Sequence, residues 1–478
     1  MQTFNPYLPA NEYIPDGEPR VFGDRVYVYG SHDRFNAPIF CMNDYVCWSA
    51  PVDDLSAWRY EGVIYRKKQD PANWTGLRLL FAPDVVQGTD GRFYLYYAFD
   101  FLGMMGVAVS ERPEGPYTFH GHVHYADGTI WGRRKGDEFP FDPGVLVDDD
   151  GRVYLYSGFA TKVPFILSRL HDLRNSGGVG MELEQDMLTI RTAPKLLFPR
   201  KGNHPPADFT GHAFFEASSI RKIDGKYVFA YSSETNHELC YAVSEHPLEG
   251  FRYGGTLVDI GDVGLAGHPD ETHAVNYLGN THGGMANLNG RWYIFYHRQT
   301  NQHSYSRQAC AEPLERTADG GFRQAEVTSC GLNGGPLKGR GEYEARIACN
   351  LWSKDGTARY DVRFPKRKHP YLTQRGKDGD EKAIQYIANM RDGSVAGFKY
   401  FDLHDLRGIR VTFAGHCEGV LEVSADEGFT AIAASIPVTS QGGTANAFAP
   451  ISAPDGVQPL FFRFRGKGRM DFYGFELI

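Results

Sequence analysis

The 478-residue chain is long enough for two domains, because one hydrophobic core seldom serves more than about 250–300 residues. Aromatic residues make up 14% of it, 55 residues are glycine, and the formal net charge is −8 with acidic and basic residues interspersed. This composition favours an all-β protein and argues against nucleic acid as a partner, because no basic stripe is present to neutralise phosphates.

The N-terminal residues Met1 to Pro6 include neither a basic segment nor an apolar segment of the kind that directs export. No run of about 18 apolar residues occurs in the chain, so no membrane span is expected. The seven cysteines are scattered and form no CxxC pair. We therefore expect a cytoplasmic protein with reduced thiols.

A basic residue followed by an alternating run rich in Tyr and Phe recurs five times. The runs begin at Arg25, Arg92, Arg152, Lys226 and Arg291. The intervals between them, 60 to 74 residues, each hold about four short strands with turns, which is the size of one propeller blade. The repeat predicts a five-bladed β-propeller.

A titratable side chain precedes each basic residue by eight to ten positions, at the start of the strand before the turn. These side chains are Asp16, Asp84, Asp142, Glu216 and His282. Since the innermost strands of a propeller line its axis, equivalent positions near their starts converge. We expect the five to share one site, although each Asp alone is also typical of a turn and a lone His of a core.

Clustered carboxyl groups cannot all ionise at low cost, so their pKa values separate and one group stays protonated beside an ionised one. Hydrolysis of a glycosidic bond needs such a pair, because an acid protonates the leaving oxygen while a base activates water. Glu216 follows Phe214 and Phe215, and apolar surroundings raise a carboxyl pKa, which favours Glu216 as the acid. Asp16 and Asp142 lie beside turn residues and suit base and tuning roles.

Several motifs resemble those of glycoside hydrolase family 43. They are Ile14-Pro15-Asp16-Gly17, Phe141-Asp142-Pro143-Gly144, Phe215-Glu216-Ala217-Ser218-Ser219 and Tyr296-His297-Arg298. The resemblance covers roughly residues 5–330 and implies an inverting mechanism on a five-bladed propeller. It implies Asp16 as general base, Glu216 as general acid, and Asp142 as the group that orients the acid and raises its pKa. The first motif reads Asp-Gly-Glu-Pro where Asp-Pro is usual, so Glu18 stays open as an alternative base.

Five further assignments concern substrate binding. Phe81 and Asp84 belong to a Phe-Ala-Pro-Asp motif in which the family often has Trp, and for Asp84 both substrate contact and structural hydrogen bonding are open. Phe215 adjoins Glu216, and Arg307 stands where similar proteins often have a substrate-binding arginine, although a solvated surface arginine is the alternative. His282 resembles a fifth-blade histidine that lies beneath the sugar and in some members binds calcium through water. No cofactor is required, and a structural calcium ion at the axis is the one metal that the resemblance suggests.

A basic, Gly-rich stretch at residues 334–341 predicts a domain boundary, and short alternating strands without the blade repeat follow it. They predict a jelly-roll-like β-sandwich. The expected domains are a catalytic propeller over residues 1–335 and an accessory sandwich over residues 336–478. The last strand, residues 469–477, weakly resembles carbohydrate-binding module family 6. A packing role is favoured for this domain, and glycan binding stays open.

The resemblance implies an exo-acting α-L-arabinofuranosidase or β-xylosidase that releases pentose units from short plant-derived oligosaccharides, its expected partners. An endo-arabinanase with an open groove is an alternative, but long insertions at residues 31–80 and 232–280 favour a walled pocket. A propeller that binds sugar without cleaving it is the non-enzyme alternative, and the presence of all three acids argues against it.

Overall fold

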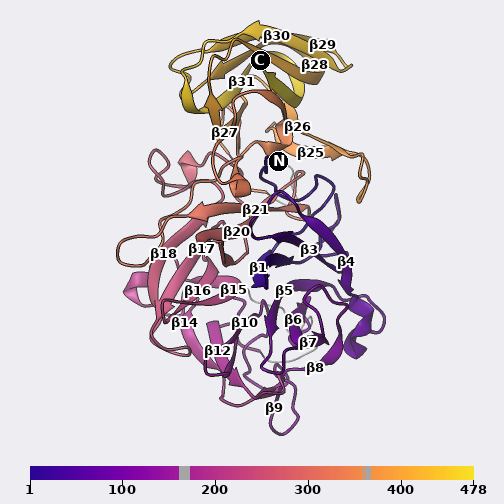
Figure 1. Cartoon of the computed structure of the whole chain (residues 1–478), viewed down its shortest axis with the longest axis vertical. Helices are drawn as coiled ribbons and strands as arrows, with labels where there is room; N and C mark the ends of the chain where they lie inside the picture. Colours follow the sequence, from indigo (N-terminus) through magenta and orange to yellow (C-terminus); the bar gives the residue numbers. More distant parts are fainter. Residues whose placement is uncertain (161–172, 358, 361–367) are drawn as a thin grey trace.

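The computed structural model describes residues 1–160, 173–357, 359–360 and 368–478. In these ranges almost all regular structure is β-strand, and a smaller domain lies on top of a propeller (Figure 1). None of the helices described is long and apolar enough to span a membrane. They are the single 3-10 turns η1 (Lys67–Gln69), η2 (Pro71–Asn73), η3 (Ala207–Phe209), η4 (Glu271–His273), η5 (Gly331–Asn333) and η6 (Ala345–Ile347).

The propeller has five blades, each a separate sheet built mainly from antiparallel strands, in chain order. Blade 1 contains β1 (Glu18–Phe22), β2 (Arg25–Tyr29), β3 (Tyr45–Pro51) and β4 (Arg59–Tyr65). Blade 2 contains β5 (Leu80–Gln87), β6 (Phe93–Phe99), β7 (Met105–Ser110) and β8 (Thr118–His122). Blade 3 contains β9 (His124–Tyr125), β10 (Gly144–Val147), β11 (Val153–Ser157), β12 (Gly177–Leu183), β13 (Thr189–Ile190) and β14 (Lys195–Pro199). Blade 4 contains β15 (Phe214–Ile223), β16 (Lys226–Ser233), β17 (Glu238–Ser244) and β18 (Arg252–Asp259). Blade 5 contains β19 (Met285–Leu288), β20 (Arg291–Gln299) and β21 (Arg307–Leu314).

The N-terminal segment covers the free edge of blade 5. The Tyr7 amide donates to the Ala309 carbonyl over 3.2 Å. The Asn5 side chain donates to the Ala311 carbonyl over 2.9 Å and accepts from the Ala311 amide over 3.0 Å. These contacts replace a fourth strand beside β21, so the first and last segments of the propeller are held together.

The recurring aromatic runs form the second strand of each sheet counted from the axis, β2, β6, β11, β16 and β20, which confirms the five-bladed propeller. Tyr29, Tyr96 and Tyr156 on these strands are completely buried. The cores lie between neighbouring blades, and Tyr29, for example, belongs to one cluster with Leu95 of blade 2. In the turn before β6, Gly91 has a φ of 84°, which a residue without a Cβ adopts at no steric cost.

Strand register separates Asp84 from the other titratable residues. In blade 1, Glu18 pairs with Tyr29, and in blade 2 Asp84 pairs with the equivalent Tyr96. Asp84 is therefore the counterpart of Glu18, and Asp16 lies two residues before that level. The offset from the basic residue misses this difference because the hairpin turn has two unpaired residues in blade 1 and five in blade 2.

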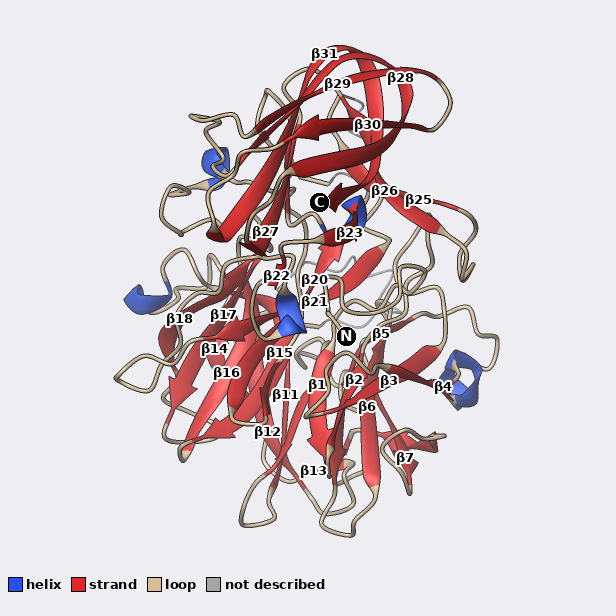
Figure 2. Cartoon of the chain, turned by 45° about the horizontal axis from the view of Figure 1, so that its top comes forward, coloured by secondary structure: helices blue, strands red, loops and turns tan. Residues whose placement is uncertain are grey.

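The second domain is a single ten-stranded sheet that folds over a core of its own, as expected for a β-sandwich (Figure 2). Its long strands β28 and β31 pair with each other and with shorter strands on both sides. The strands are β22 (Leu337–Lys338), β23 (Gly341–Glu344), β24 (Asn350–Trp352), β25 (Tyr371–Arg375), β26 (Ile384–Met390), β27 (Val395–Leu403), β28 (Gly408–Ser424), β29 (Ala434–Gln441), β30 (Ala445–Pro450) and β31 (Gly456–Leu477).

Buried polar contacts fix the second domain to the propeller. The Lys399 ammonium lies 2.9 Å from Asp262 and 2.8 Å from Glu326, and Lys399 is only 5% exposed. The guanidinium of Arg298 in β20 donates to the Ala348 carbonyl over 3.0 Å. Because breaking a buried ion pair leaves an uncompensated charge, these contacts oppose separation of the two domains.

Candidate active site

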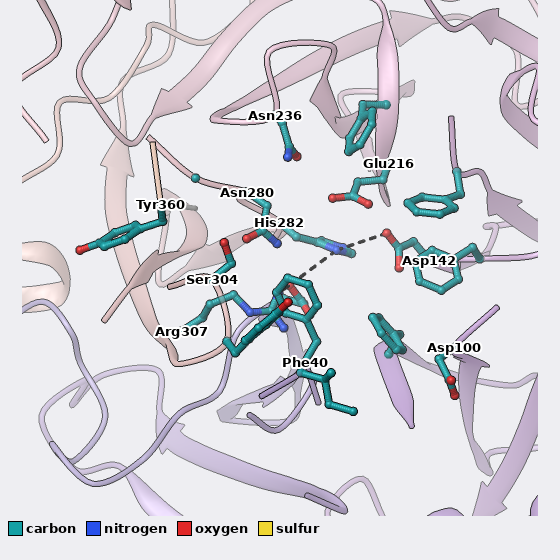
Figure 3. A pocket seen from close by; sticks show the side chains of 18 of the residues that line it. Phe40, Asp100, Asp142, Glu216, Asn236, Asn280, His282, Ser304, Arg307 and Tyr360 are labelled. Carbon is teal, nitrogen blue, oxygen red and sulfur yellow. Dashed lines mark hydrogen bonds and ion pairs between the residues drawn. The ribbon is translucent and has the colours of Figure 1, made fainter. Parts of the chain in front are cut away.

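A cavity of about 630 Å³ lies at the ends of the innermost strands. Asp16 precedes β1, Asp142 precedes β10, Glu216 lies in β15 and His282 precedes β19. All four line the cavity, and Figure 3 shows Asp142, Glu216 and His282 pointing into it. Four of the five titratable residues that the repeat singled out are thus brought together from four blades.

Irregular backbone turns these side chains towards the axis. Asp16 has a φ of 57° and Asp142 a φ of 45°, a left-handed conformation that Asp tolerates better than most residues. In β15 the register shifts on both sides of Glu216, and Ala217 has a φ of 71°. Such conformations persist where the surrounding structure over-determines them, and they are concentrated at functional sites.

Asp16 is buried beside a permanent positive charge. Its Oδ1 lies 2.9 Å from Nη1 of Arg307 and 3.3 Å from Nδ1 of His297. Burial alone would raise the pKa of Asp16, but attraction to Arg307, His297 and His282 outweighs it and lowers the pKa. Asp16 is therefore ionised at neutral pH.

Arg307 lines the cavity and has two carboxylate partners. Besides Asp16, it contacts Asp33, which accepts from its Nε over 2.8 Å, its Nη2 over 3.0 Å and its backbone amide over 3.0 Å. Asp33 is completely buried and Arg307 is 3% exposed. This pairing fixes the guanidinium beside Asp16, so Arg307 is not a solvated surface residue.

Asp142 and Glu216 experience the opposite electrostatic effect. Burial, followed by repulsion from Glu216 and Asp16, raises the pKa of Asp142 well above its usual value. Burial and the charge of Asp16 raise the pKa of Glu216 to about 8. Because the two carboxyls interact, protons leave them as a pair, and at neutral pH the pair retains a proton.

An aromatic wall explains the desolvation of the two carboxyls. Phe81, Phe141, Phe159 and Phe215 all line the cavity. Ring centroids lie 5.2 Å apart for Phe81 and Phe141 and 4.6 Å apart for Phe141 and Phe159. The structure thus places both phenylalanines assigned to substrate binding, Phe81 and Phe215, at the cavity surface. Phe159 lies in a loop after β11 and carries no sequence signal that would have identified it.

His282 lies between two of the carboxyls, with Nδ1 3.6 Å from Asp142 Oδ2 and 4.0 Å from Asp16 Oδ1. Burial lowers its pKa to about 4 against the attraction of Asp16, so the ring is neutral at pH 7. It belongs to no direct metal-ligand cluster, because within the described ranges the one group of three suitable side chains is His212, Glu238 and Cys240. Calcium bound through water by His282 stays a prediction.

Asp84 and Glu18 lie outside the cavity lining. Asp84 is paired with Arg20 over 2.5 Å and accepts from the Val145 amide over 2.7 Å. Glu18 lies 2.5 Å from Arg221. Both carboxylates thus belong to a buried charge network, which places Asp84 in a structural hydrogen-bonding environment. Asp16, unlike Glu18, faces the cavity.

Sequence reasoning missed several cavity residues. The cavity is also lined by Asn236, Asn280, Ser304 and Tyr360. Two further residues contact the site without lining the cavity: Asp33 pairs with Arg307, and His297 lies beside Asp16. His297 accepts the Asp16 amide at Nδ1 over 3.1 Å. Of these, His297 falls within the motif Tyr296-His297-Arg298, and Asn280 lies two residues before His282. The others lie on loops, where no periodic pattern indicates the direction of a side chain.

The geometry combines one ionised carboxylate with a protonated carboxyl pair in one partly apolar cavity. That separation of pKa values suits a reaction in which one group takes a proton from water and another gives a proton to a leaving oxygen. The neutral His282 and the paired Arg307 can donate hydrogen bonds to a ligand lying between them.

Comparisons with known proteins agree with this geometry. The family model described as glycosyl hydrolases family 43 matches residues 12–322. A xylosidase/arabinosidase from Thermoclostridium stercorarium is 48% identical over 478 residues, covering 100% of this chain and 99% of the relative. A GH43_1 enzyme from Xanthomonas citri matches 66% of this chain and 93% of its own, with 26% identity and a TM-score of 0.51. An arabinoxylan arabinofuranohydrolase from Bacillus subtilis, solved in complex with cellotetraose, shares the fold over 98% of this chain and 96% of its own, with 21% identity and a TM-score of 0.50.

Proposed function

The chain belongs to family 43 of the glycosyl hydrolases, and we propose that it is an inverting exo-glycosidase that releases arabinofuranose or xylose from short plant-derived oligosaccharides. The observation that carries the proposal is the opposite pKa shift of carboxyls in one cavity, lowered for Asp16 and raised for Asp142 and Glu216. The name of the relative that is 48% identical over the whole chain, xylosidase/arabinosidase, supports pentose as the released sugar.

In this mechanism Asp16 takes a proton from a water molecule as the water attacks the anomeric carbon. Arg307, held by Asp33, keeps Asp16 ionised before the reaction. Glu216 gives its proton to the glycosidic oxygen, so the sugar that leaves departs as a neutral alcohol. Asp142 is coupled to Glu216, and repulsion between the two carboxylates disfavours the loss of the last proton from the pair. The aromatic wall excludes water from Glu216 and favours its protonated form.

The wall of the cavity supports exo-action. Residues from all five blades line it, including Phe40 and Leu79 from the insertion at residues 31–80 and Asn236 and Leu278 from the insertion at residues 232–280. A pocket lined by residues of every blade suits a chain end, whereas an endo-acting arabinanase needs a groove that a chain can cross. The presence of three carboxyls, Asp16, Asp142 and Glu216, in one cavity also distinguishes the protein from a propeller that only binds sugar.

A substrate screen tests the proposal. The protein is expected to release free pentose, one unit at a time, from xylotriose or arabinotriose and to cleave the nitrophenyl pentosides, while a nitrophenyl glucoside serves as the control that is not cleaved. Chromatography of early time points checks the products. Disaccharide formed without monosaccharide, or binding of the trisaccharides without cleavage, would contradict exo-hydrolysis.

We further propose that the protein resides in the cytoplasm and acts on oligosaccharides already taken into the cell. The scattered cysteines support this location. All seven cysteines are free and buried, as expected for thiols that are not needed for crosslinks.

A further inference from the structure

A short segment of the second domain reaches the cavity. Arg359 and Tyr360 line it together with residues of the propeller. Arg359 forms a parallel bridge with Leu278, and the Tyr360 amide donates to the Leu278 carbonyl over 3.0 Å. The Tyr360 ring stacks on Tyr277 with 4.7 Å between centroids and an angle of 22°. The segment therefore lies parallel to the loop before β19 and is hydrogen-bonded to it, as an additional strand would be.

An ion-pair chain holds this segment from the propeller side. Arg359 lies 2.5 Å from Glu271 and donates to the Thr235 carbonyl over 3.2 Å. Glu271 also lies 3.0 Å from Nε2 of His237, whose Nδ1 lies 2.6 Å from Asp259. His237 is 2% exposed, so the inner end of the chain is rigidly packed. Tyr360 is thus presented to the cavity from a fixed position.

The position of Tyr360 relative to the acids identifies which part of a substrate it meets. Figure 3 shows Tyr360 at the margin of the cavity, with Asn280 and His282 between it and Asp142 in this view. The sugar whose bond is cleaved must lie at the axis, between Asp16 and Glu216, because both act on its anomeric centre. Because an exo-acting enzyme holds the chain end at the axis, the sugars beyond the cleaved bond extend outwards to the margin of the cavity.

Asn236 supports a sugar-binding role for the part of the cavity next to Glu216. Its side chain points into the cavity beside Glu216 (Figure 3). The Oδ1 atom is buried and has no hydrogen-bond partner within the described ranges. A buried acceptor without a partner is costly, and a sugar hydroxyl is a donor that would satisfy it.

We propose that the second domain forms part of the binding site for the leaving sugar, in which the exposed part of the Tyr360 ring packs against the apolar face of that sugar and Asn236 accepts one of its hydroxyls. One face of the Tyr360 ring is taken by Tyr277, so the rest of the ring is available to the ligand. This inference rests on the proposed function, because it assigns the leaving-group subsite of the same cavity. It gives the second domain a direct part in substrate selection, beyond packing.

The test compares a substrate that has a leaving sugar with one that has none. In the full-length protein, Tyr360→Ala should lower kcat/KM for xylotriose about three- to tenfold, mainly through KM, and leave hydrolysis of xylosyl fluoride unchanged, because fluoride cannot contact Tyr360. Tyr360→Phe keeps the ring and should behave as the wild type. Tyr473→Ala is a matched control, because Tyr473 also stacks on a tyrosine, Tyr386, at 4.7 Å, and does not line the cavity.

The outcomes separate this inference from the proposed function. A wild type that cleaves neither these xylosides nor the corresponding arabinosides, arabinotriose and arabinofuranosyl fluoride, overturns the proposed function and the inference with it. If the wild type cleaves both and Tyr360→Ala matches it on xylotriose, the subsite assignment alone is wrong. An equal loss on both substrates would show that Tyr360 acts on folding or on the axis, and would also overturn the assignment.

Discussion

Replacing Asp16 with asparagine is expected to lower kcat by about 100-fold or more, because the attacking water loses its proton acceptor. The substitution is nearly isosteric, and asparagine tolerates the φ of 57° at this position. Steady-state kinetics on xylotriose and on a nitrophenyl xyloside measure the effect, which should appear with both substrates because both need the same water.

The fold should survive the Asp16→Asn change. Arg307 keeps three hydrogen bonds to Asp33, so the buried guanidinium still has a counter-ion. We expect a melting temperature within a few degrees of the wild type. Asp24→Asn is a matched control, since Asp24 is exposed in the turn between β1 and β2, and it should retain full activity. Activity of Asp16→Asn near the wild-type level, or a collapse of its melting temperature, would remove Asp16 from the base role.

Replacing Glu216 with glutamine is expected to separate substrates by their leaving groups. The leaving group of xylotriose is xylobiose, a poor leaving group that needs a proton, so hydrolysis of xylotriose should fall about 100- to 10,000-fold. A dinitrophenyl xyloside needs no proton on its leaving oxygen, so much of its hydrolysis should remain. Glu245→Gln, an exposed change in the same blade, is the control. Equal rates of the variant and the wild type on both substrates would contradict the acid role.

The pH dependence provides a second readout for Glu216. The acid must be protonated to act, and its pKa is raised to about 8, so wild-type activity on xylotriose should fall as the pH rises through about 8. This alkaline limb should be absent when Glu216→Gln hydrolyses the dinitrophenyl xyloside. Asp142→Asn should move the limb to lower pH, because Asp142 and Glu216 lose protons as a coupled pair and the repulsion between the two carboxylates is absent in the variant. An unshifted limb in that variant would remove the tuning role of Asp142.

The propeller could be predicted from sequence because each blade repeats the same physical requirement. Tyr29, Tyr96 and Tyr156 are completely buried on the second strands, and burial between blades keeps an aromatic residue at each of these positions. The same repeat located Asp16, Asp142, Glu216 and His282, since equivalent strand starts meet at the axis.

The rest of the site depends on features that a repeat does not encode. The offset from the basic residue places Asp84 with Asp16 because it does not reveal that the two hairpin turns differ in length. Asn236 and Ser304 lie on loops, whose conformations have no periodic signature. Tyr360 comes from beyond the domain boundary, and only tertiary packing brings it to the cavity. Local pattern thus identifies the carboxyls that we propose to react, while the residues that we propose to contact the substrate require the folded structure.

The anomeric configuration of the first product tests the central claim most directly. Because Asp16 is assigned to activate water on the side of the sugar opposite Glu216, each turnover should invert the anomeric centre. Proton NMR of a nitrophenyl β-xyloside digest, recorded before mutarotation, should show α-xylose appearing first. β-Xylose as the first product would mean that a carboxylate attacks the sugar directly, and would contradict the assignment of Asp16 as a base acting through water.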